Sequence, residues 1–279
     1  MKRSLTWLAR VVLVLAVYMI SSLAAERAAA PTGGSAASSA QSGAASQAAG
    51  SQAASSAAAS QDEAAAASAA AKAAAIAEAQ AQLDDPLMVL VSPAHAMPEG
   101  YEVGETVTCS TDVNNGTLAK EAAEAFKAMK AAAKEDGVTL HLQSGYRSVE
   151  YQAGLFQRQI QKWKDTGMDT EAATEKAKTV VTPPGHSEHN CGLAADINSP
   201  EYYALEEPFK NTKAYAWLCE HAEAYGFILR YPKEKEAVTG IIYEPWHWRY
   251  VGAENAARIN ATGLCLEEYV AQLQATVAG

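Results

Sequence analysis

Two short stretches of the sequence hold side chains that could together bind a catalytic metal ion. In the first, His189 lies seven positions before Asp196. In the second, Glu244 lies three positions before His247. Two histidines and one aspartate can hold zinc while leaving one position open for water, as catalytic zinc sites do. A glutamate that does not bind the metal can take a proton from the attacking water and deliver it to a leaving amine. The set therefore predicts metal-assisted hydrolysis of an amide bond, with Zn²⁺ as the cofactor.

A third stretch, residues 144–148, supplies a cation for the same reaction. Arg147 follows a predicted strand and precedes a predicted helix, where it could stabilise the oxyanion that develops during amide hydrolysis. Ser148 and Ser187 could form hydrogen bonds with a substrate, and Gln152 lies one helical turn beyond Ser148. We therefore predict a catalytic role for Arg147 and a substrate-binding role for the other three.

The backbone must place these residues in one cleft. Residues 192–197 read as a loop that leads into a strand, and alternation along the strand puts Asp196 opposite the apolar side chains beside it. His247 lies on the last predicted strand. A straight chain would point Glu244 and His247 to opposite faces, so the assignment requires a bend near Pro245.

Taken singly, each candidate also has an ordinary structural interpretation. Asp196 could cap a turn, and Arg147 could form a surface ion pair. A lone histidine is more often a hydrogen-bonded structural residue than a metal ligand. We interpret the remaining histidines in that way: His95, His141, His186 and His221.

The pattern of apolar residues predicts a mixed domain. Helices are predicted at 118–136, 149–165, 170–178, 211–225, 253–260 and 266–276, and strands at 138–143, 227–231, 240–243 and 246–251. Helices and strands do not alternate regularly. The expected fold class is therefore α+β, with a small, mainly antiparallel central sheet and flanking helices.

The N-terminal third differs from this domain. Lys2, Arg3 and Arg10 accompany an apolar run at 11–23, followed by small residues, so residues 1–30 predict a signal peptide or an N-terminal membrane anchor. The short apolar run favours export, with a retained anchor as the alternative. Either one predicts an extracytoplasmic protein that is secreted or anchored to the outer face of the cell membrane.

The composition of residues 31–85, mainly Ala, Ser and Gln, predicts a low-complexity linker. The segment has few large apolar side chains to offset the entropy of ordering, so we expect a disordered tether, with some helix at 62–83. The folded domain is expected at 86–279. Its size allows a core that needs no disulfides.

Charge and cysteine content restrict the partners. The formal net charge of −10 argues against nucleic acid or anionic lipid as a partner, because both are bound by clustered Lys and Arg. We expect a monomer. Cys109, Cys191, Cys219 and Cys265 allow two disulfides with three alternative pairings, or buried thiols.

Three stretches of the sequence resemble a known family. Residues 144–148, 184–197 and 227–252 are similar to the VanY-type D-alanyl-D-alanine carboxypeptidases, zinc peptidases that trim bacterial cell-wall peptides. The similarity covers residues 86–265 in outline. It implies an α+β domain with a central antiparallel sheet.

The resemblance also implies a role for each candidate. Three residues match the zinc ligands: His189, Asp196 and His247. Glu244 matches the catalytic base, and Arg147 matches the residue that polarises the scissile carbonyl. Ser187 and Gln152 match positions that line the substrate pocket.

The expected function is zinc-dependent removal of the C-terminal D-alanine from peptidoglycan stem peptides or their precursors. Two alternatives keep the same chemistry at another bond, namely an L,D-carboxypeptidase and a D,D-dipeptidase. A non-catalytic, zinc-containing cell-wall-binding module and a plain exported scaffold are alternatives of another class. Glu244 and Arg147 argue against a purely structural zinc site, which would need neither a base nor a cation.

Overall fold

The computed structural model describes residues 46–110 and 115–279. Within the described residues, Glu63–Gly279 forms one compact unit, which carries every element that forms the site. The predicted signal peptide or anchor, residues 1–30, lies outside the described residues, as does the start of the predicted linker. Among the helices of the described part, none is both long and apolar enough to cross a membrane.

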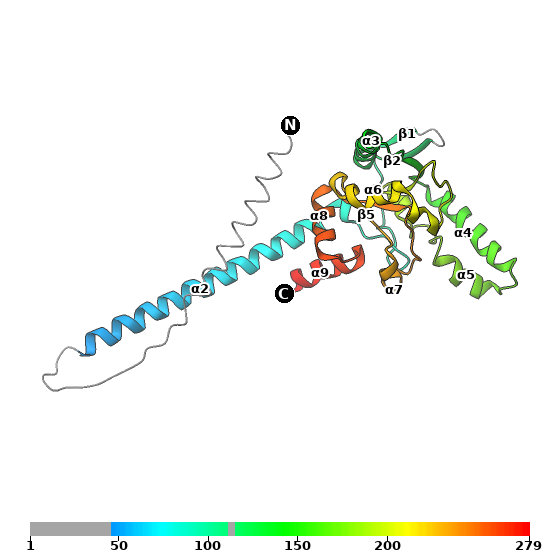
Figure 1. The fold of residues 1–279 in the computed structure, drawn as a ribbon. Helices are drawn as coiled ribbons and strands as arrows, with labels where there is room; N and C mark the ends of the chain where they lie inside the picture. Colours follow the sequence, from blue (N-terminus) through cyan, green and yellow to red (C-terminus); the bar gives the residue numbers. More distant parts are fainter. Residues whose placement is uncertain (1–45, 111–114) are drawn as a thin grey trace, which may run out of the picture. The chain divides into compact units, whose positions relative to one another are not determined.

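Much of the predicted linker is helical. The helix α2 spans Ser46–Leu83 (Figure 1). It includes the helix expected at 62–83, because alanine has the highest helix propensity of all residues. The end of α2 packs into the compact unit. Ala79 is buried, and the Tyr269 hydroxyl donates a hydrogen bond of 2.6 Å to Gln82 Oε1. The compact unit therefore begins upstream of residue 86.

A four-stranded antiparallel sheet forms the centre of this unit. Its strands in spatial order are β3 (His141–Ser144), β4 (Ala194–Asn198), β6 (His247–Tyr250) and β5 (Phe227–Leu229). A separate antiparallel hairpin pairs β1 (Thr106–Ser110) with β2 (Asn115–Ala119). The predicted α+β class with a small antiparallel sheet is confirmed.

Helices surround the sheet. After α2 they are α3 (Lys120–Glu135), α4 (Val149–Lys164), α5 (Thr170–Lys178), α6 (Lys213–His221), α7 (Glu236–Thr239), α8 (Ala253–Thr262) and α9 (Leu266–Ala278). Short 3-10 turns lie at Pro86–Met88, Glu188–Cys191, Glu207–Asn211, Ala222–Tyr225 and Lys233–Lys235. The predicted strand at 240–243 is wrong. Gly240 takes a left-handed conformation that ends α7, and Ile242 N–H donates to the Thr179 carbonyl rather than to a neighbouring strand.

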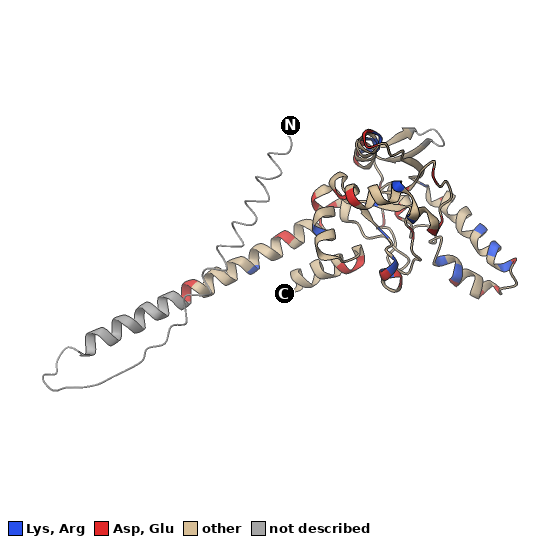
Figure 2. Cartoon of the chain, viewed as in Figure 1, with Lys and Arg blue, Asp and Glu red and all other residues tan. Residues whose placement is uncertain are grey.

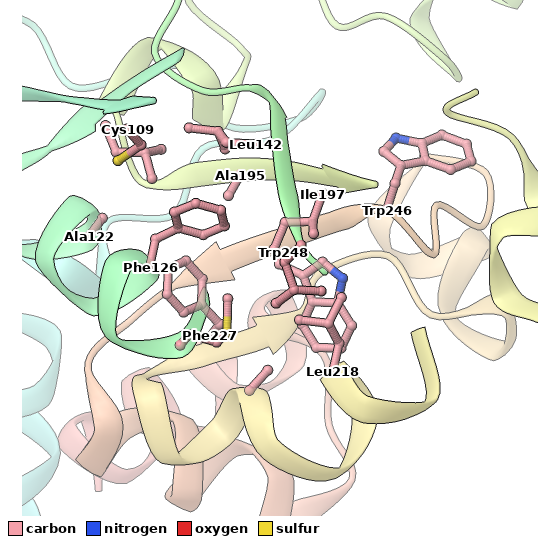
Figure 3. Packing of buried hydrophobic residues seen from close by; sticks show 14 of the residues in the cluster. Cys109, Ala122, Phe126, Leu142, Ala195, Ile197, Leu218, Phe227, Trp246 and Trp248 are labelled. Atoms are coloured by element: carbon pink, nitrogen blue, oxygen red, sulfur yellow. The ribbon is translucent and has the colours of Figure 1, made fainter. Parts of the chain in front are cut away.

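The main core lies on one face of the sheet. Leu142, Ile197 and Trp248 point from three strands toward Phe126 of α3 and Leu218 of α6 (Figure 3). Burying each of these side chains contributes about 1.5–3 kcal/mol. Because side chains alternate along a strand, neighbours of these residues must face the other side of the sheet.

The helices α4 and α5 pack against each other beside that other face. Their contact is a small apolar cluster of Phe156, Ile160, Ala173 and Ala177. Figure 2 shows several basic residues on this pair of helices. Acidic residues lie there as well, including Glu171 in the first turn of α5. The chain that enters α4 and the chain that leaves α5 both contribute to the site described below.

Candidate active site and metal centre

Strand pairing brings the predicted metal ligands together. Asp196 of β4 lies directly opposite His247 of β6 in the antiparallel register, so both side chains leave the same face of the sheet. His189 comes from the 3-10 turn Glu188–Cys191 that precedes β4. All three residues are buried, and one ligand atom from each lies within 4.8 Å of the others.

The oxygen atoms of Asp196 face the two rings. His189 Nε2 lies 3.3 Å from Asp196 Oδ2, and His247 Nδ1 lies 3.1 Å from Oδ1. Asp196 Oδ1 is nevertheless buried without a hydrogen bond. A buried carboxylate oxygen whose nearest nitrogen, here His247 Nδ1, does not form a hydrogen bond of good geometry is well satisfied by a cation that both groups face. Two imidazoles and one carboxylate are also the donor set of open zinc sites.

Hydrogen bonds on the far side of each ring set its orientation. His189 Nδ1 lies 2.7 Å from the Gly145 carbonyl oxygen, which can only accept a hydrogen bond. The proton therefore sits on Nδ1, and the Nε2 lone pair faces the site. His247 is turned the other way, with Nε2 at 3.4 Å from Glu188 Oε2 and Nδ1 toward the site. Such outer contacts commonly orient metal-binding histidines.

The bend that the assignment requires is present at Pro245. His247 N–H donates to the Glu244 carbonyl at 3.1 Å, which closes a turn just before β6. The turn brings Glu244 Oε2 within 3.6 Å of His247 Nδ1. Glu244 is 6 % exposed, and in the described part of the chain its only ion-pair contact is with this ring.

The surroundings of Glu244 favour a bound proton. Burial raises the pKa of its carboxyl to about 8, with the charges of Asp196 and Glu188 acting in the same direction and those of His247 and Arg147 opposing them. A carboxyl whose pKa lies near neutrality can both accept and release a proton during a reaction.

The other groups of the centre are shifted as well. Burial opposes a charge on His247, yet contacts with Asp196 and Glu188 raise its pKa to about 9. Burial and the charge of Arg147 lower the pKa of His189. Burial opposes ionisation of Asp196, but its histidine and arginine neighbours hold its pKa well below the usual range. The centre therefore holds one fixed anion among groups that can exchange protons.

Arg147 reaches the centre from the end of β3. Its Nη2 donates to Asp196 Oδ2 at 2.8 Å, its Nε to Ser144 Oγ at 2.9 Å, and its Nη1 lies 3.4 Å from Gln152 Oε1. Its side chain is 17 % exposed. The guanidinium is thus held beside His189, Asp196 and His247, and part of it is open to the cavity.

These residues open into a cavity of about 250 Å³. Its polar lining comprises Arg147, Gln152, Thr182, Ser187, His189, Asp196, Tyr231, Glu244 and His247. Its apolar lining comprises Leu155, Val180, Val181, Leu205, Ile241 and Trp246. Seven of the eight predicted site residues are therefore brought to one cavity.

Ser148 is the predicted site residue that the structure does not bring to this cavity. Its hydroxyl accepts a hydrogen bond from Tyr151 N–H and caps α4. It lines a different hollow together with Tyr146 and Asn190. Helix capping accounts for the serine at this position.

All four cysteines, which lie in the described part of the chain, are free thiols. Of the two alternatives that the sequence left open, disulfides or thiols, the structure has the thiols. Cys191 is buried, and burial raises its pKa to about 11, so it stays protonated near His189. A protonated thiol is a poor metal ligand.

Sequence reasoning missed the residues behind the centre. Glu188, Arg230 and Arg249 are fully or almost fully buried and joined by ion pairs. One signal was available for Arg249: it shares the face of His247 on a strand that is otherwise aromatic and apolar. A charged residue so placed must find a buried partner. The identity of that partner depends on tertiary contacts.

Comparison with known proteins places the site in a family context. The family model described as VanY, D-alanyl-D-alanine carboxypeptidase, matches residues 115–253. A D-alanyl-D-alanine carboxypeptidase of Enterococcus faecalis is 36% identical over 196 residues, which cover 70% of this chain and 70% of that protein. The chain spans about two thirds of the length of the two first curated relatives it matches.

Solved structures of similar proteins point to the same family. The vancomycin-resistance D,D-pentapeptidase VanY, in a complex with Zn(II), is 36% identical with a TM-score of 0.59, covering 66% of this chain and 99% of that one. The LdcB LD-carboxypeptidase is 38% identical with a TM-score of 0.57, covering 67% and 87%. The zinc-bound neighbour and the buried triad together indicate zinc as the cofactor.

Proposed function

Because the chain belongs to the VanY family of D-alanyl-D-alanine carboxypeptidases, we propose that it removes the C-terminal D-alanine from peptidoglycan stem peptides in a zinc-dependent reaction. One observation carries the proposal. The buried ligand triad and the buried carboxyl of Glu244 share one cavity, and Asp196 Oδ1 faces it without a hydrogen bond.

His189, Asp196 and His247 would hold the zinc ion. Zinc bound there supplies a Lewis acid and lowers the pKa of a water molecule that it contacts. Glu244 takes the proton of the attacking water and passes it to the leaving D-alanine amine. Its raised pKa and its position 3.6 Å from His247 Nδ1 support that role.

Arg147 stabilises the negative charge that develops on the scissile carbonyl oxygen. Its bonds to Asp196 and Ser144 fix the guanidinium before substrate arrives, so little reorganisation is needed in the transition state. Ser187 and Gln152 lie on the polar wall of the cavity and provide hydrogen-bonding groups for the substrate. The apolar wall, which includes Val181, Ile241 and Trp246, suits the methyl groups of alanine.

Release of D-alanine from a UDP-linked pentapeptide tests this function. The full chain is assayed as purified, after treatment with a chelator, and after zinc is added back. We expect release that the chelator abolishes and zinc restores. Absence of release from a protein that holds one zinc ion per chain would contradict the proposed bond preference.

An L,D-carboxypeptidase is the second candidate, and the similarity to LdcB at 38% identity supports it. The same assay discriminates between the two when a tetrapeptide and free D-alanyl-D-alanine are offered beside the pentapeptide. Preference for the tetrapeptide would favour the L,D-enzyme, and cleavage of the free dipeptide would favour a D,D-dipeptidase.

We also propose that the enzyme acts outside the cytoplasmic membrane, where its polymeric substrate lies. The apolar segment at 11–23 and the names of the family relatives support this location. Fractionation of cells that express the full chain would test it. Recovery of the protein in the cytosolic fraction would contradict it.

A further inference from the structure

A buried carboxylate lies directly behind one of the proposed metal ligands. Glu188 is 1 % exposed, and its Oε2 lies 3.4 Å from His247 Nε2, at the long end for a hydrogen bond. The opposite nitrogen of the ring, Nδ1, faces Asp196 and the cavity. Glu188 therefore touches the ring on the side away from the proposed zinc ion.

Two arginines occupy the other oxygen of this carboxylate. Glu188 Oε1 accepts hydrogen bonds from Arg230 Nε at 2.7 Å and from Arg249 Nη1 at 2.6 Å. Both arginine side chains are 0 % exposed. With Oε1 used twice, Oε2 is the oxygen left for His247.

The arginines are themselves held from further segments. Arg230 forms a two-pronged ion pair with Glu267 of α9, at 2.8 and 2.7 Å. Arg249 Nη2 donates to the carbonyl oxygens of Leu87 and Val89, at 2.8 Å each. We call Glu188, Arg230, Arg249 and Glu267 the charge cage. It has two positive and two negative side chains, so its net charge is zero.

The charge cage is not an efficient way to increase the free energy of unfolding. Desolvating four charges is costly, and apolar side chains of similar volume often stabilise a core as well or better. Stability alone therefore does not explain this cage, and its contacts with other groups bear on its role. Among the described residues, the ion-pair contact that Glu188 makes outside the cage is with the ring of His247.

We infer that Glu188 is a positioning residue for the metal centre: it accepts the Nε2 proton of His247 and so presents the Nδ1 lone pair to the zinc ion. The hydrogen bonds from Arg230 and Arg249 to Oε1 fix the Glu188 side chain so that Oε2 faces the ring of His247. A glutamine at this position would keep its amide oxygen on the two arginines and turn its amide nitrogen, a donor, toward Nε2. That would favour the His247 tautomer with its proton on Nδ1, where the metal should bind. This inference rests on the zinc site of the proposed function.

Zinc affinity of two glutamine variants of the full chain tests the inference. Glu188→Gln keeps the shape of the side chain but directs an amide donor at His247. Glu267→Gln is the matched control, because it removes one negative charge from the same cage without touching that ring. Competition with a chromophoric chelator gives Kd for zinc, and thermal unfolding of the zinc-free proteins gives stability.

We expect both variants to lose stability and only Glu188→Gln to lose zinc affinity, by about 10- to 100-fold. Equal zinc affinity in the two variants overturns the inference while leaving the proposed function intact. A wild-type chain that binds no zinc overturns the metal site itself. The two failures are thus distinguishable.

A second variant covers the case in which Glu188→Gln does not fold. Combining Glu188→Gln with Arg249→Met returns the cage to zero net charge and lowers the cost of the buried arginines. The inference again predicts weak zinc binding relative to Glu267→Gln. Zinc affinity equal to that of Glu267→Gln in this double variant overturns it.

Discussion

Glu188 and Glu244 lie on opposite sides of the same imidazole ring but in contrasting environments. Glu188 Oε2 is 3.4 Å from His247 Nε2, and Glu244 Oε2 is 3.6 Å from His247 Nδ1. Both side chains are buried. Glu188 is paired with two buried arginines, whereas Glu244 has no lysine or arginine within ion-pair distance in the described part of the chain.

The two environments move the two carboxyl groups in opposite directions. Burial works against ionisation of Glu188, but the charges of Arg230 and Arg249 hold its pKa well below the ordinary range. Burial raises the pKa of Glu244 to about 8. Carboxyl groups whose environments separate their pKa values can take different roles in one site. Here one glutamate is a fixed anion and the other can carry a proton.

The largest expected effect on stability comes from opening the charge cage. Arg230→Met leaves Glu267 without its buried cation and removes one of the two cations from Glu188. We expect a loss of about 3–5 kcal/mol in the free energy of unfolding of the zinc-free protein. Urea denaturation followed by circular dichroism measures it.

The matched control is Arg258→Met, the same substitution at a partly exposed arginine that also contacts two carboxylates. A pair of this kind contributes about 0–1 kcal/mol. Equal losses in the two variants would mean that the cage is no stronger than a surface network.

On the cavity side of His247, where Glu244 lies, replacing Arg147 should affect the reaction rate more than the stability of the fold. Arg147 is partly exposed and already hydrogen-bonded to neutral groups as well as to Asp196. We expect Arg147→Met to lower kcat about 10²- to 10³-fold in zinc-saturated enzyme, because one preorganised charge at the oxyanion is lost. Its loss of stability should be smaller than that of Arg230→Met.

Steady-state kinetics on the pentapeptide measures this effect. A rise in KM with unchanged kcat would contradict the assigned role, because it would show that Arg147 binds the ground state and the transition state equally.

A smaller effect should appear in the pH dependence of stability. The pKa of Glu244 is about 8 in the folded, zinc-free chain and about 4.5 when unperturbed. Its stabilising contribution is therefore complete below about pH 4.5 and is lost as pH rises through about 8. Glu244→Gln cannot ionise, so its stability relative to wild type should increase over this window.

Urea denaturation of both zinc-free proteins at several pH values gives the comparison. Parallel stability curves would show that Glu244 ionises normally in the folded chain, and the contrast with Glu188 would then disappear.

Sequence reasoning found the cavity side of His247 because local rules determine it. The spacing from His189 to Asp196 and from Glu244 to His247 suggested the ligands and the base, and strand alternation indicated which face they share. The bend at Pro245, needed for Glu244 and His247 to meet, is present. The strand register that places Asp196 opposite His247 depends on tertiary contacts. The sequence indicated that the two residues must meet but not which register brings them together.

The contacts on the Nε2 side of His247 could not be predicted from spacing and strand alternation. Glu188 lies 42 positions from Arg230 and 61 from Arg249, and the partners Leu87 and Glu267 come from opposite ends of the folded unit. No periodicity links them. Composition explains the helix α2. Its part at 62–83 was expected, and its start at Ser46 was not, because a composition typical of disorder is also rich in alanine, the best helix former.

The most direct test of the account is to measure D-alanine release and zinc content in the same preparations of wild type and Glu244→Gln. Glu234→Gln, at an exposed glutamate, serves as the control. If Glu244 is the base, its variant keeps one zinc ion per chain and loses about 10²- to 10⁴-fold in kcat. A Glu244→Gln enzyme that retains about a tenth of wild-type activity with zinc bound, or that loses its zinc, would contradict the assignment of Glu244 as a proton carrier beside an intact metal centre.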